Sequence, residues 1–285
     1  MLTEFAVPHR FRFIAASLTA FLVSCLPRTA AADEVWLAAR PFSPAVGAST
    51  AFSLNTGEYF SGEPLPISAS RAAAVHLYSR AAPTDLGAQL PPDQALPEMR
   101  LTPPAAGTYM LAYDSHPDQI SLPADQFHAY LHEAGLDSII SQREDDGNAE
   151  QPGRERYRRH LKTLLRVGGK SDGTYSVLTG QRLEIVPASD PLARSAGDKL
   201  TFTLFFDSKP LAGALVKAWH KQDEQTLTIR AQTGDGGKVG FNLPYAGVWM
   251  ISAVHMLPAT DTQDIDWDSF RGSLTFELAG KNIGR

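Results

Sequence analysis

Histidine and carboxylate side chains are the residues of this sequence whose spacing could support metal chemistry. His128 and His132 stand four residues apart in a segment with helical periodicity, which places both imidazoles on one side of a helix, as in many metal sites. A zinc peptidase needs glutamate directly after the first histidine, but Ala129 holds that position. We therefore favour two solvent-exposed histidines over a metal-binding pair.

A second group of potential ligands lies near the C-terminus. Asp264, Asp266 and Asp268 alternate along the chain, and alternating carboxylates in a loop can converge on calcium. The EF-hand pattern fails, because it requires glycine where Ser269 stands and glutamate where Thr275 stands. A solvated acidic loop is the favoured interpretation, and a calcium site is the alternative.

His255 differs from the other histidines because it interrupts an apolar segment, residues 248–256, that has the composition of a strand. In strict alternation it shares a face with Trp249 and Ile251. A histidine in such a place must form a hydrogen bond, bind a metal or line a pocket. A hydrogen-bonded structural histidine is the favoured interpretation, and a metal ligand is the alternative.

The motifs of several enzyme classes are incomplete. Gly169-Lys170-Ser171 resembles the end of a phosphate-binding loop, but Leu164 stands where that loop requires glycine. No G-x-S-x-G nucleophile motif occurs. We therefore expect no enzymatic activity.

The composition is typical of a globular protein. The chain has 285 residues, of which 43% are hydrophobic and 20% charged, and its net charge is −5. These values exclude a disordered chain, and the acidic balance argues against nucleic acid as a partner. At this length one or two domains are expected.

The first 32 residues predict export. A basic start and an apolar run lead to Ala30-Ala31-Ala32, which predicts a signal peptide cleaved before Asp33. The segment 22–25, Leu-Val-Ser-Cys, offers the alternative of a lipoprotein anchored through Cys25, the single cysteine. Both alternatives predict a periplasmic location. Cleavage leaves 23 basic and 30 acidic residues, a net charge of −7, and no later apolar stretch approaches membrane length.

Two short segments recur in the same order in both halves of the chain. Residues 104–111 (PAAGTYML) resemble 244–251 (PYAGVWMI), and residues 47–54 (GASTAFSL) resemble 197–204 (GDKLTFTL). Their alternating apolar residues predict half-buried strands. We expect a mainly β protein of two Ig-like or transthyretin-like β-sandwich lobes, residues 33–118 and 171–285.

Residues 119–170 are expected to form a two-helix insert between the lobes. The first helix is predicted to begin at Pro123 and to bury Phe127 and Tyr130. The second is predicted over Arg154–Arg166 and is strongly basic. This helix could attract anionic lipid or an acidic partner, but a solvated face that pairs with the acidic remainder of the protein is the favoured interpretation.

Several segments, in order along the mature chain, carry a resemblance to a known family. They are Val35-Trp36-Leu37, residues 122–127, 130–131, 135–137, 154–157, 162–164, 247–249, 253–256, 266–269 and 274–276. These segments are similar to an exported bacterial family of unknown function labelled NikM-like, or nickel-uptake-associated.

The resemblance implies a periplasmic accessory protein that handles nickel or cobalt ions beside a membrane transporter. It implies His255 as a metal ligand, because His255 falls on a family-like position, with Asp33 as an additional carboxylate ligand. The histidine that the family usually shows just before its Trp-Leu is absent, since Asp33 and Glu34 stand there. Val35 likewise fills the third position, where an amino-terminal copper or nickel site needs histidine.

The leading expectation is therefore an exported, non-enzymatic accessory or binding protein for nickel or cobalt. The alternative is a structural module, or a β-sandwich that binds protein or carbohydrate without metal, by analogy with similar folds. Exposure of Trp219, Trp249 or Trp267 on one surface would favour the alternative, whereas burial of all three would count against sugar binding on aromatic rings. Since no cysteine remains in the folded body, metal ligands would have to be histidine and carboxylate.

Overall fold

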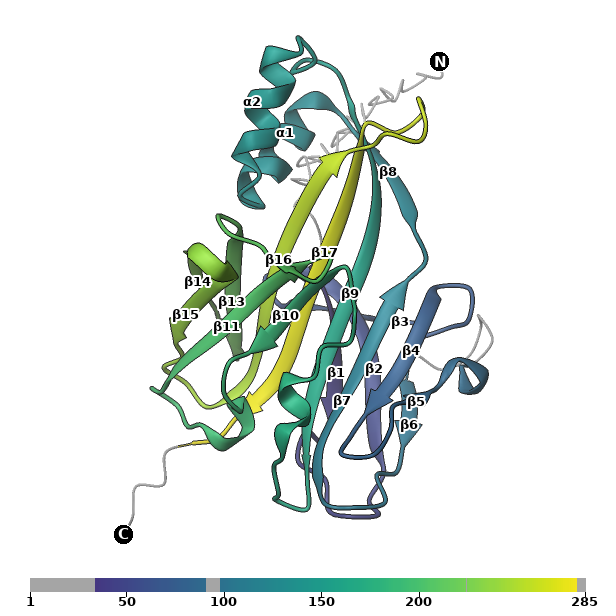
Figure 1. The fold of residues 1–285 in the computed structure, drawn as a ribbon, viewed down its shortest axis with the longest axis vertical. Coiled ribbons are helices and arrows are strands. Elements are labelled where there is room, and N and C mark those ends of the chain that lie inside the picture. The colour runs from purple at the N-terminus through teal and green to yellow at the C-terminus, as the bar shows by residue number, and fades with distance from the viewer. Residues whose placement is uncertain (1–33, 91–97, 224, 281–285) are drawn as a thin grey trace, which may run out of the picture.

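The computed structural model describes residues 34–90, 98–223 and 225–280, and within these ranges the chain forms three β-sheets and two α-helices (Figure 1). Short 3-10 turns lie at η1 (Gly87–Gln89), η2 (Gly173–Ser176), η3 (Pro191–Ala193) and η4 (Asp235–Gly237). None of the helices in these ranges is both long and apolar enough to cross a membrane.

A nine-stranded sheet is the largest of the three sheets. Across the sheet the strands are β14 (Gln225–Gln232), β13 (Leu215–Gln222), β16 (Gly247–Pro258), β17 (Trp267–Leu278), β9 (Gly153–Val167), β7 (Gly107–Ser115), β4 (Ala72–Tyr78) and β5 (Thr84–Asp85), while β8 (Asp118–Leu122) also pairs with β9. The two halves of the chain join where β17 runs parallel to β9, with Trp267 opposite Glu155. The lobes therefore share one continuous sheet.

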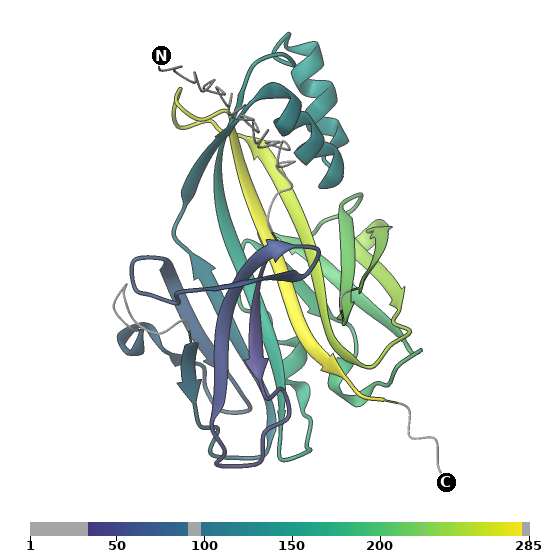
Figure 2. The same cartoon turned by 180° about the vertical axis from the view of Figure 1, so that it is seen from behind.

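Two small sheets cover this large sheet on opposite faces, as the front and back views show (Figures 1 and 2). The first contains β1 (Glu34–Arg40), β2 (Thr50–Glu58), β3 (Ser61–Leu65) and β6 (Glu98–Leu101). The second contains β10 (Leu183–Pro187), β11 (Lys199–Phe206), β12 (Lys209–Pro210) and β15 (Lys238–Asn242). Each small sheet and the part of the large sheet beneath it form a β-sandwich.

The side-chain alternation of strands explains the two cores. On β16, Trp249 and Ile251 face the second small sheet and join a core that includes Phe202. Met250, one residue along, faces the other way and packs near Trp36 of β1. The predicted mainly β fold with two sandwich lobes and a two-helix insert is thus confirmed.

The helical insert consists of α1 (Ala124–Glu133) and α2 (Asp137–Asp145) at one end of the molecule (Figure 1). Helix α1 follows Pro123 and buries Phe127 and Tyr130, as predicted. The two helices are separated by Gly135, whose φ of +71° is a conformation that glycine adopts readily. Their apolar faces pack against the sheet around Met256 and Trp267.

The predicted second helix over Arg154–Arg166 is wrong, because these residues lie in β9. The leucines of this segment suggested helical spacing, but β9 lies inside the sheet and is buried on both faces along its second half, so its apolar residues do not alternate. Arg154 and Arg156 do alternate, and they form ion pairs with Asp266 and Asp268 of the neighbouring segment. The second helix instead begins seventeen residues earlier, at Asp137.

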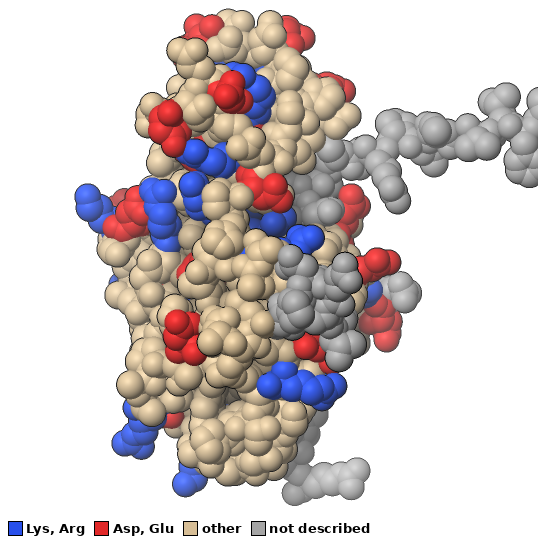
Figure 3. Space-filling view, turned by 90° about the vertical axis from the view of Figure 1, so that its right-hand side faces the viewer, with Lys and Arg blue, Asp and Glu red and all other residues tan. Residues whose placement is uncertain are grey.

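Charged side chains of both signs gather at and just below the helical end of the molecule, whereas the lower part of the same face is largely uncharged (Figure 3). Ion pairs also join arginines of β9 to aspartates in and just before β17.

Candidate binding site

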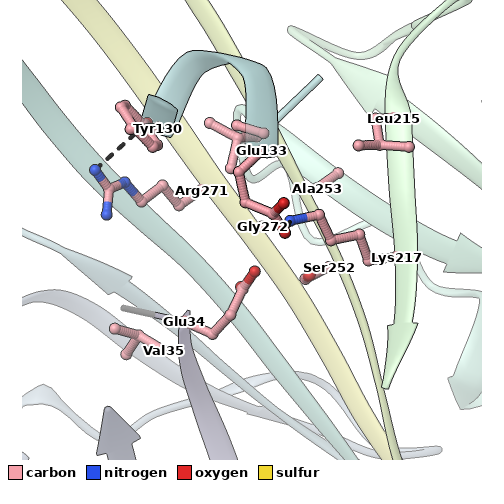
Figure 4. A pocket seen from close by; sticks show the side chains of 12 residues that line it. Glu34, Val35, Tyr130, Glu133, Leu215, Lys217, Ser252, Ala253, Arg271 and Gly272 are labelled. Carbon is pink, nitrogen blue, oxygen red and sulfur yellow. Dashed lines mark hydrogen bonds and ion pairs between the residues drawn. The ribbon is translucent and has the colours of Figure 1, made fainter. Parts of the chain in front are cut away.

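A small charged pocket lies where α1 meets the sheet (Figure 4). Its cavity volume is about 40 Å³, enough for a water molecule or a single ion but not for a sugar or a peptide. Its polar lining comes from four strands and one helix: Glu34, Tyr130, Glu133, Lys217, Ser252 and Arg271. No short sequence motif contains this set.

Hydrogen bonds between strands position Glu34 at the pocket. β1 lies on the face of β17, where Ser273 Oγ donates to the carbonyl of Val35 at 3.1 Å and Thr275 Oγ1 donates to that of Leu37 at 2.6 Å. These bonds fix strand β1 against the large sheet, so Glu34 projects over Ser252 and Gly272 (Figure 4).

Lys217 and Glu133 form the opposite side of the pocket. Lys217 Nζ donates to Glu133 Oε1 at 2.9 Å, and Arg230 donates to the same oxygen. The Lys217 side chain is 9% exposed, and its ammonium lies 5.3 Å from the ring centroid of Trp219. Lys217 is thus held by a carboxylate and an aromatic ring, between the apolar residues Val216 and Ala218 of β13.

Glu34 is a carboxyl group of the pocket lining whose pKa is perturbed by burial. Burial raises the pKa of Glu34 above its ordinary value, and the nearby charges of Lys217 and Arg271 offset part of this effect. Among the described residues, no ion pair within 4 Å joins Glu34 to a basic side chain. The side chain of Ser252 hydrogen-bonds to Glu34, which also favours the charged form. Glu34 is therefore a buried carboxyl group with a hydroxyl partner but no ion-pair partner, which makes it a candidate for ligand binding.

A second polar cluster lies beneath the pocket and anchors α1. Glu155 is fully buried on β9, and its Oε1 accepts hydrogen bonds from Arg271 at 2.8 Å, from the hydroxyl of Tyr130 at 3.3 Å, and from Ser269. Burial raises the pKa of Tyr130, so this hydroxyl stays protonated. The cluster fixes α1 to β9 and β17 and thereby holds Glu133 over the cavity.

The arrangement supports binding chemistry. Two carboxylates, Glu34 and Glu133, face one cavity, and Lys217 supplies a positive charge between the strands and the helix. Such carboxylates are hard oxygen ligands for a cation. For a cation to reach Glu133, Lys217 has to withdraw, because two positive charges in one small cavity repel each other strongly.

His255 lies on the other face of the sheet. The ring of His255 packs edge-on against Phe206 at 4.4 Å, and burial lowers its pKa. Ser252 of the same strand lines the pocket with Glu34, and residues three apart on a strand face opposite ways. Asp33 lies outside the described residues, directly before Glu34. A joint site of His255 and Asp33 therefore stays a prediction.

In the part of the chain that the structure describes, no group of three or more His, Cys, Asp or Glu side chains is placed to hold a metal ion. His128 is exposed, and His132 bonds to Asp137 at 3.0 Å on the surface. Asp266 and Asp268 are engaged by arginines of β9.

The three tryptophans that could have carried sugar binding are all buried, with exposures of 3% for Trp219, 0% for Trp249 and 5% for Trp267. They form no exposed aromatic surface, which counts against sugar binding on these rings.

Sequence reasoning missed Glu34, Glu133 and Lys217 as one group. The Lys217–Glu133 pair spans 84 residues, so spacing alone carries no signal for it. The one available signal was Lys217 itself, a charged residue between Val216 and Ala218 in an apolar strand.

Comparisons with known proteins identify a family and little else. A search of curated proteins finds no match. Solved structures with some similarity include a tetra-tandem repeat in the extending region of a large adhesion protein, with a TM-score of 0.23 and 10% identity over 88% of this chain and 50% of that one. The chain thus spans about half the length of that structure.

Another is the chicken CNTN1 FN1-FN3 domains, with a TM-score of 0.20 and 5% identity over 83% of this chain and 62% of that one. A third is a Salmonella alpha-2-macroglobulin mutant, with a TM-score of 0.22 and 10% identity over 87% of this chain and 16% of that one. The family described as "Domain of unknown function (DUF4198)" matches residues 30–257, most of the chain, so the protein belongs to the DUF4198 family.

Proposed function

We propose that this protein is an exported, non-enzymatic accessory protein that binds a transition-metal cation, nickel or cobalt, at the pocket beside Glu34. The observation that carries the proposal is Glu34 itself. It is a buried carboxyl group with a raised pKa, it has no ion-pair partner among the described residues, and it faces Glu133 across a cavity the size of one ion.

Export supports the location of the site. Cleavage before Asp33 would place a free amino group and the Asp33 carboxylate one residue before Glu34. An amine and carboxylates are ligands that nickel and cobalt accept. Lipidation at Cys25 is the alternative form of export, and it would leave seven residues between the anchor and Asp33. The mature protein would be periplasmic in either form.

The NikM-like resemblance supports the choice of metal. It comes from sequence segments at both ends of the mature chain, and one of them, Val35-Trp36-Leu37, immediately follows Glu34. In this proposal Asp33 keeps its role as a ligand, Glu34 joins it, and His255 is a separate position on the opposite face of the sheet. A membrane transporter is the proposed recipient of the ion.

Lys217 gives the proposal a property that can be measured. Its ammonium group donates a hydrogen bond to the Glu133 carboxylate, which an incoming cation would also bind. Lys217 therefore competes with the cation for Glu133. Removing the ammonium should tighten the binding of a cation. If the pocket instead took an anion, removing it would weaken binding.

The experiment is calorimetric titration of the mature protein, residues 33–285 with a free amino terminus, with nickel and cobalt chloride. We expect one site per chain with a Kd below about 100 μM, an affinity loss of at least about tenfold in Glu34→Gln, and tighter binding in Lys217→Met. Glu63→Gln, at an exposed glutamate of β3, is the matched control and should bind as the wild type does.

Three results would contradict the proposal. They are the absence of binding by either metal, binding that Glu34→Gln leaves unchanged, and binding that Lys217→Met weakens. Binding lost only in His255→Ala would transfer the site to the other face of the sheet.

A structural or interaction module without metal is the alternative function. The burial of the three tryptophans counts against an aromatic sugar-binding surface, and the fold alone names no partner. If the mature protein binds neither nickel nor cobalt, the function without metal is the one that remains.

A further inference from the structure

A second cleft lies in the N-terminal lobe, where β7 ends and β8 begins. It has a volume of about 340 Å³, which falls in the range of small-molecule sites. Its polar and charged lining includes Arg71, Tyr113, Ser115, His116, Asp118 and Arg159. The Glu34 pocket shares none of these residues.

Arg159 carries a positive charge into this cleft without a carboxylate to neutralise it. Its neighbours Arg156 and Arg158 point to the other face of β9, where Asp268 pairs with both. Arg159 instead lies over the ring of Tyr157 at 4.6 Å. Burial lowers the pKa of Arg159, and among the described residues no acidic side chain lies within ion-pair distance of it. A buried, uncompensated cation is costly, and an anion bound beside it would offset that cost.

The remaining charges leave the cleft positive. Arg71 is exposed and forms no ion pair with the described residues. Asp118 is the acidic residue of the lining, and its carboxylate already accepts from the hydroxyl of Tyr157 at 3.0 Å and from the backbone of Gln119 at 2.8 Å. Two arginines thus face one engaged carboxylate, in a protein whose net charge is −5.

Hydroxyl groups complete the lining. Ser115 Oγ accepts from the backbone N–H of Arg159 at 2.9 Å and keeps its own proton to donate. Tyr113 lines the same cleft, and burial raises the pKa of its hydroxyl to about 12. Both hydroxyls can therefore donate hydrogen bonds to an anion.

We propose that this cleft binds the oxyanion group of a small molecule, a carboxylate or a phosphate or sulfate, between Arg71 and Arg159. Guanidinium groups present forked N–H donors that match the oxygens of these groups. The contact with Tyr157 holds the Arg159 fork before a ligand arrives, and the exposed Arg71 lines the same cleft. The site shares no lining residue with the proposed metal pocket.

The test is calorimetric titration of the mature protein at constant ionic strength with sodium acetate, sodium phosphate and sodium sulfate. We expect saturable binding of at least one anion with a Kd of about 1 mM or tighter. Arg71→Gln and Arg159→Lys should each weaken that binding by at least about fivefold. Arg71→Gln removes a positive charge, whereas Arg159→Lys keeps the charge but loses the forked N–H donors of the guanidinium group. Arg100→Gln, at an exposed arginine of the same lobe, should change it by less than about twofold.

The ranking of the three anions identifies the ligand class: a preference for acetate indicates a carboxylate, and a preference for phosphate or sulfate indicates a phosphorylated or sulfated ligand. Arg71 is exposed, so Arg71→Gln should fold normally, and its thermal unfolding midpoint verifies this. If Arg159→Lys proves unstable, Arg71→Gln alone tests the proposal. Absence of saturable binding by all three anions would overturn the proposal. Equal binding in the wild type and in Arg71→Gln would also overturn it.

Discussion

Two lysine–glutamate pairs in this protein have nearly the same geometry and very different surroundings. Lys162 Nζ lies 3.0 Å from Glu184 Oε1, and the two side chains are 1% and 3% exposed. Glu184 also accepts from the backbone and hydroxyl of Thr179 and from the backbone of Gly180. All of its partners come from the folded protein, so no ligand has access to either charge.

The pair of Lys217 and Glu133 has a similar separation, 2.9 Å, but Glu133 is 43% exposed and shares its oxygen with Arg230. A cavity lies beside it, with Glu34 on the far side. Removing Lys217 would therefore leave Glu133 with water and an arginine. Ion-pair distance alone therefore does not separate a structural pair from an exchangeable pair, one in which a ligand could replace the lysine. The exposure of the carboxylate to solvent and the presence of a second partner, such as Arg230, do separate them.

The largest expected effect is on the buried pair. Lys162→Met leaves Glu184 as an uncompensated buried charge, which should lower the free energy of unfolding by about 3–5 kcal/mol. Urea denaturation at pH 7 measures this. The double variant Lys162→Met/Glu184→Gln should regain part of the loss, because it removes the orphaned charge. A loss under about 1 kcal/mol in the single variant would show that the pair is not the buried structural element we describe.

The exchangeable pair should respond less. Lys217→Met should lower the free energy of unfolding by no more than about 2 kcal/mol, since Glu133 keeps Arg230 and contact with water. The same urea titration, with the two lysine variants side by side, measures the difference. If Lys217→Met were as destabilising as Lys162→Met, the distinction between the two pairs would fail.

The smallest effect concerns the pH dependence of Glu34. Its pKa is raised in the folded protein above the ordinary value of 4.5, so its contribution to stability is fully present below that value and is lost as pH rises through the raised pKa. Glu34→Gln stays neutral at every pH. We therefore expect the variant to match the wild type near pH 4 and to be more stable at pH 7.

Thermal unfolding of the metal-free mature proteins at the two pH values measures this difference. Glu63→Gln serves as the control, because its glutamate is exposed. A variant that is less stable than the wild type at pH 7 would mean that the Glu34 carboxylate is stabilised in the fold rather than strained by burial.

Much of the fold was predictable from the sequence wherever a pattern of apolar residues is typical of one kind of secondary structure only. Helix α1 was found because Phe127 and Tyr130 form a stripe on a surface helix. Strand β9 was missed because its leucines are buried on both faces, which removes the alternation that marks a strand. Arg154 and Arg156 alternate along the chain, as do Asp266 and Asp268, and in the fold they pair with each other between neighbouring segments. Taken one segment at a time, the same residues predict a basic helix and an acidic loop.

The candidate site was far less predictable. Glu34, Glu133 and Lys217 meet because β1 lies on β17 while α1 packs over the end of the same sheet. The contact of β1 with β17 spans 238 residues and that of Lys217 with Glu133 spans 84, and local residue patterns carry no information about such pairings. His255 was visible in the sequence because it interrupts an apolar strand, but the same alternation rule places it on the face away from Glu34.

The central claim, that the mature chain carries a metal cation beside Glu34, is tested most directly by elemental analysis of the protein purified from the periplasm, the location we propose for it. The account predicts about one nickel or cobalt ion per chain in the wild type and a loss of at least about tenfold in Glu34→Gln. Metal at equal levels in both proteins, or in neither, would contradict it.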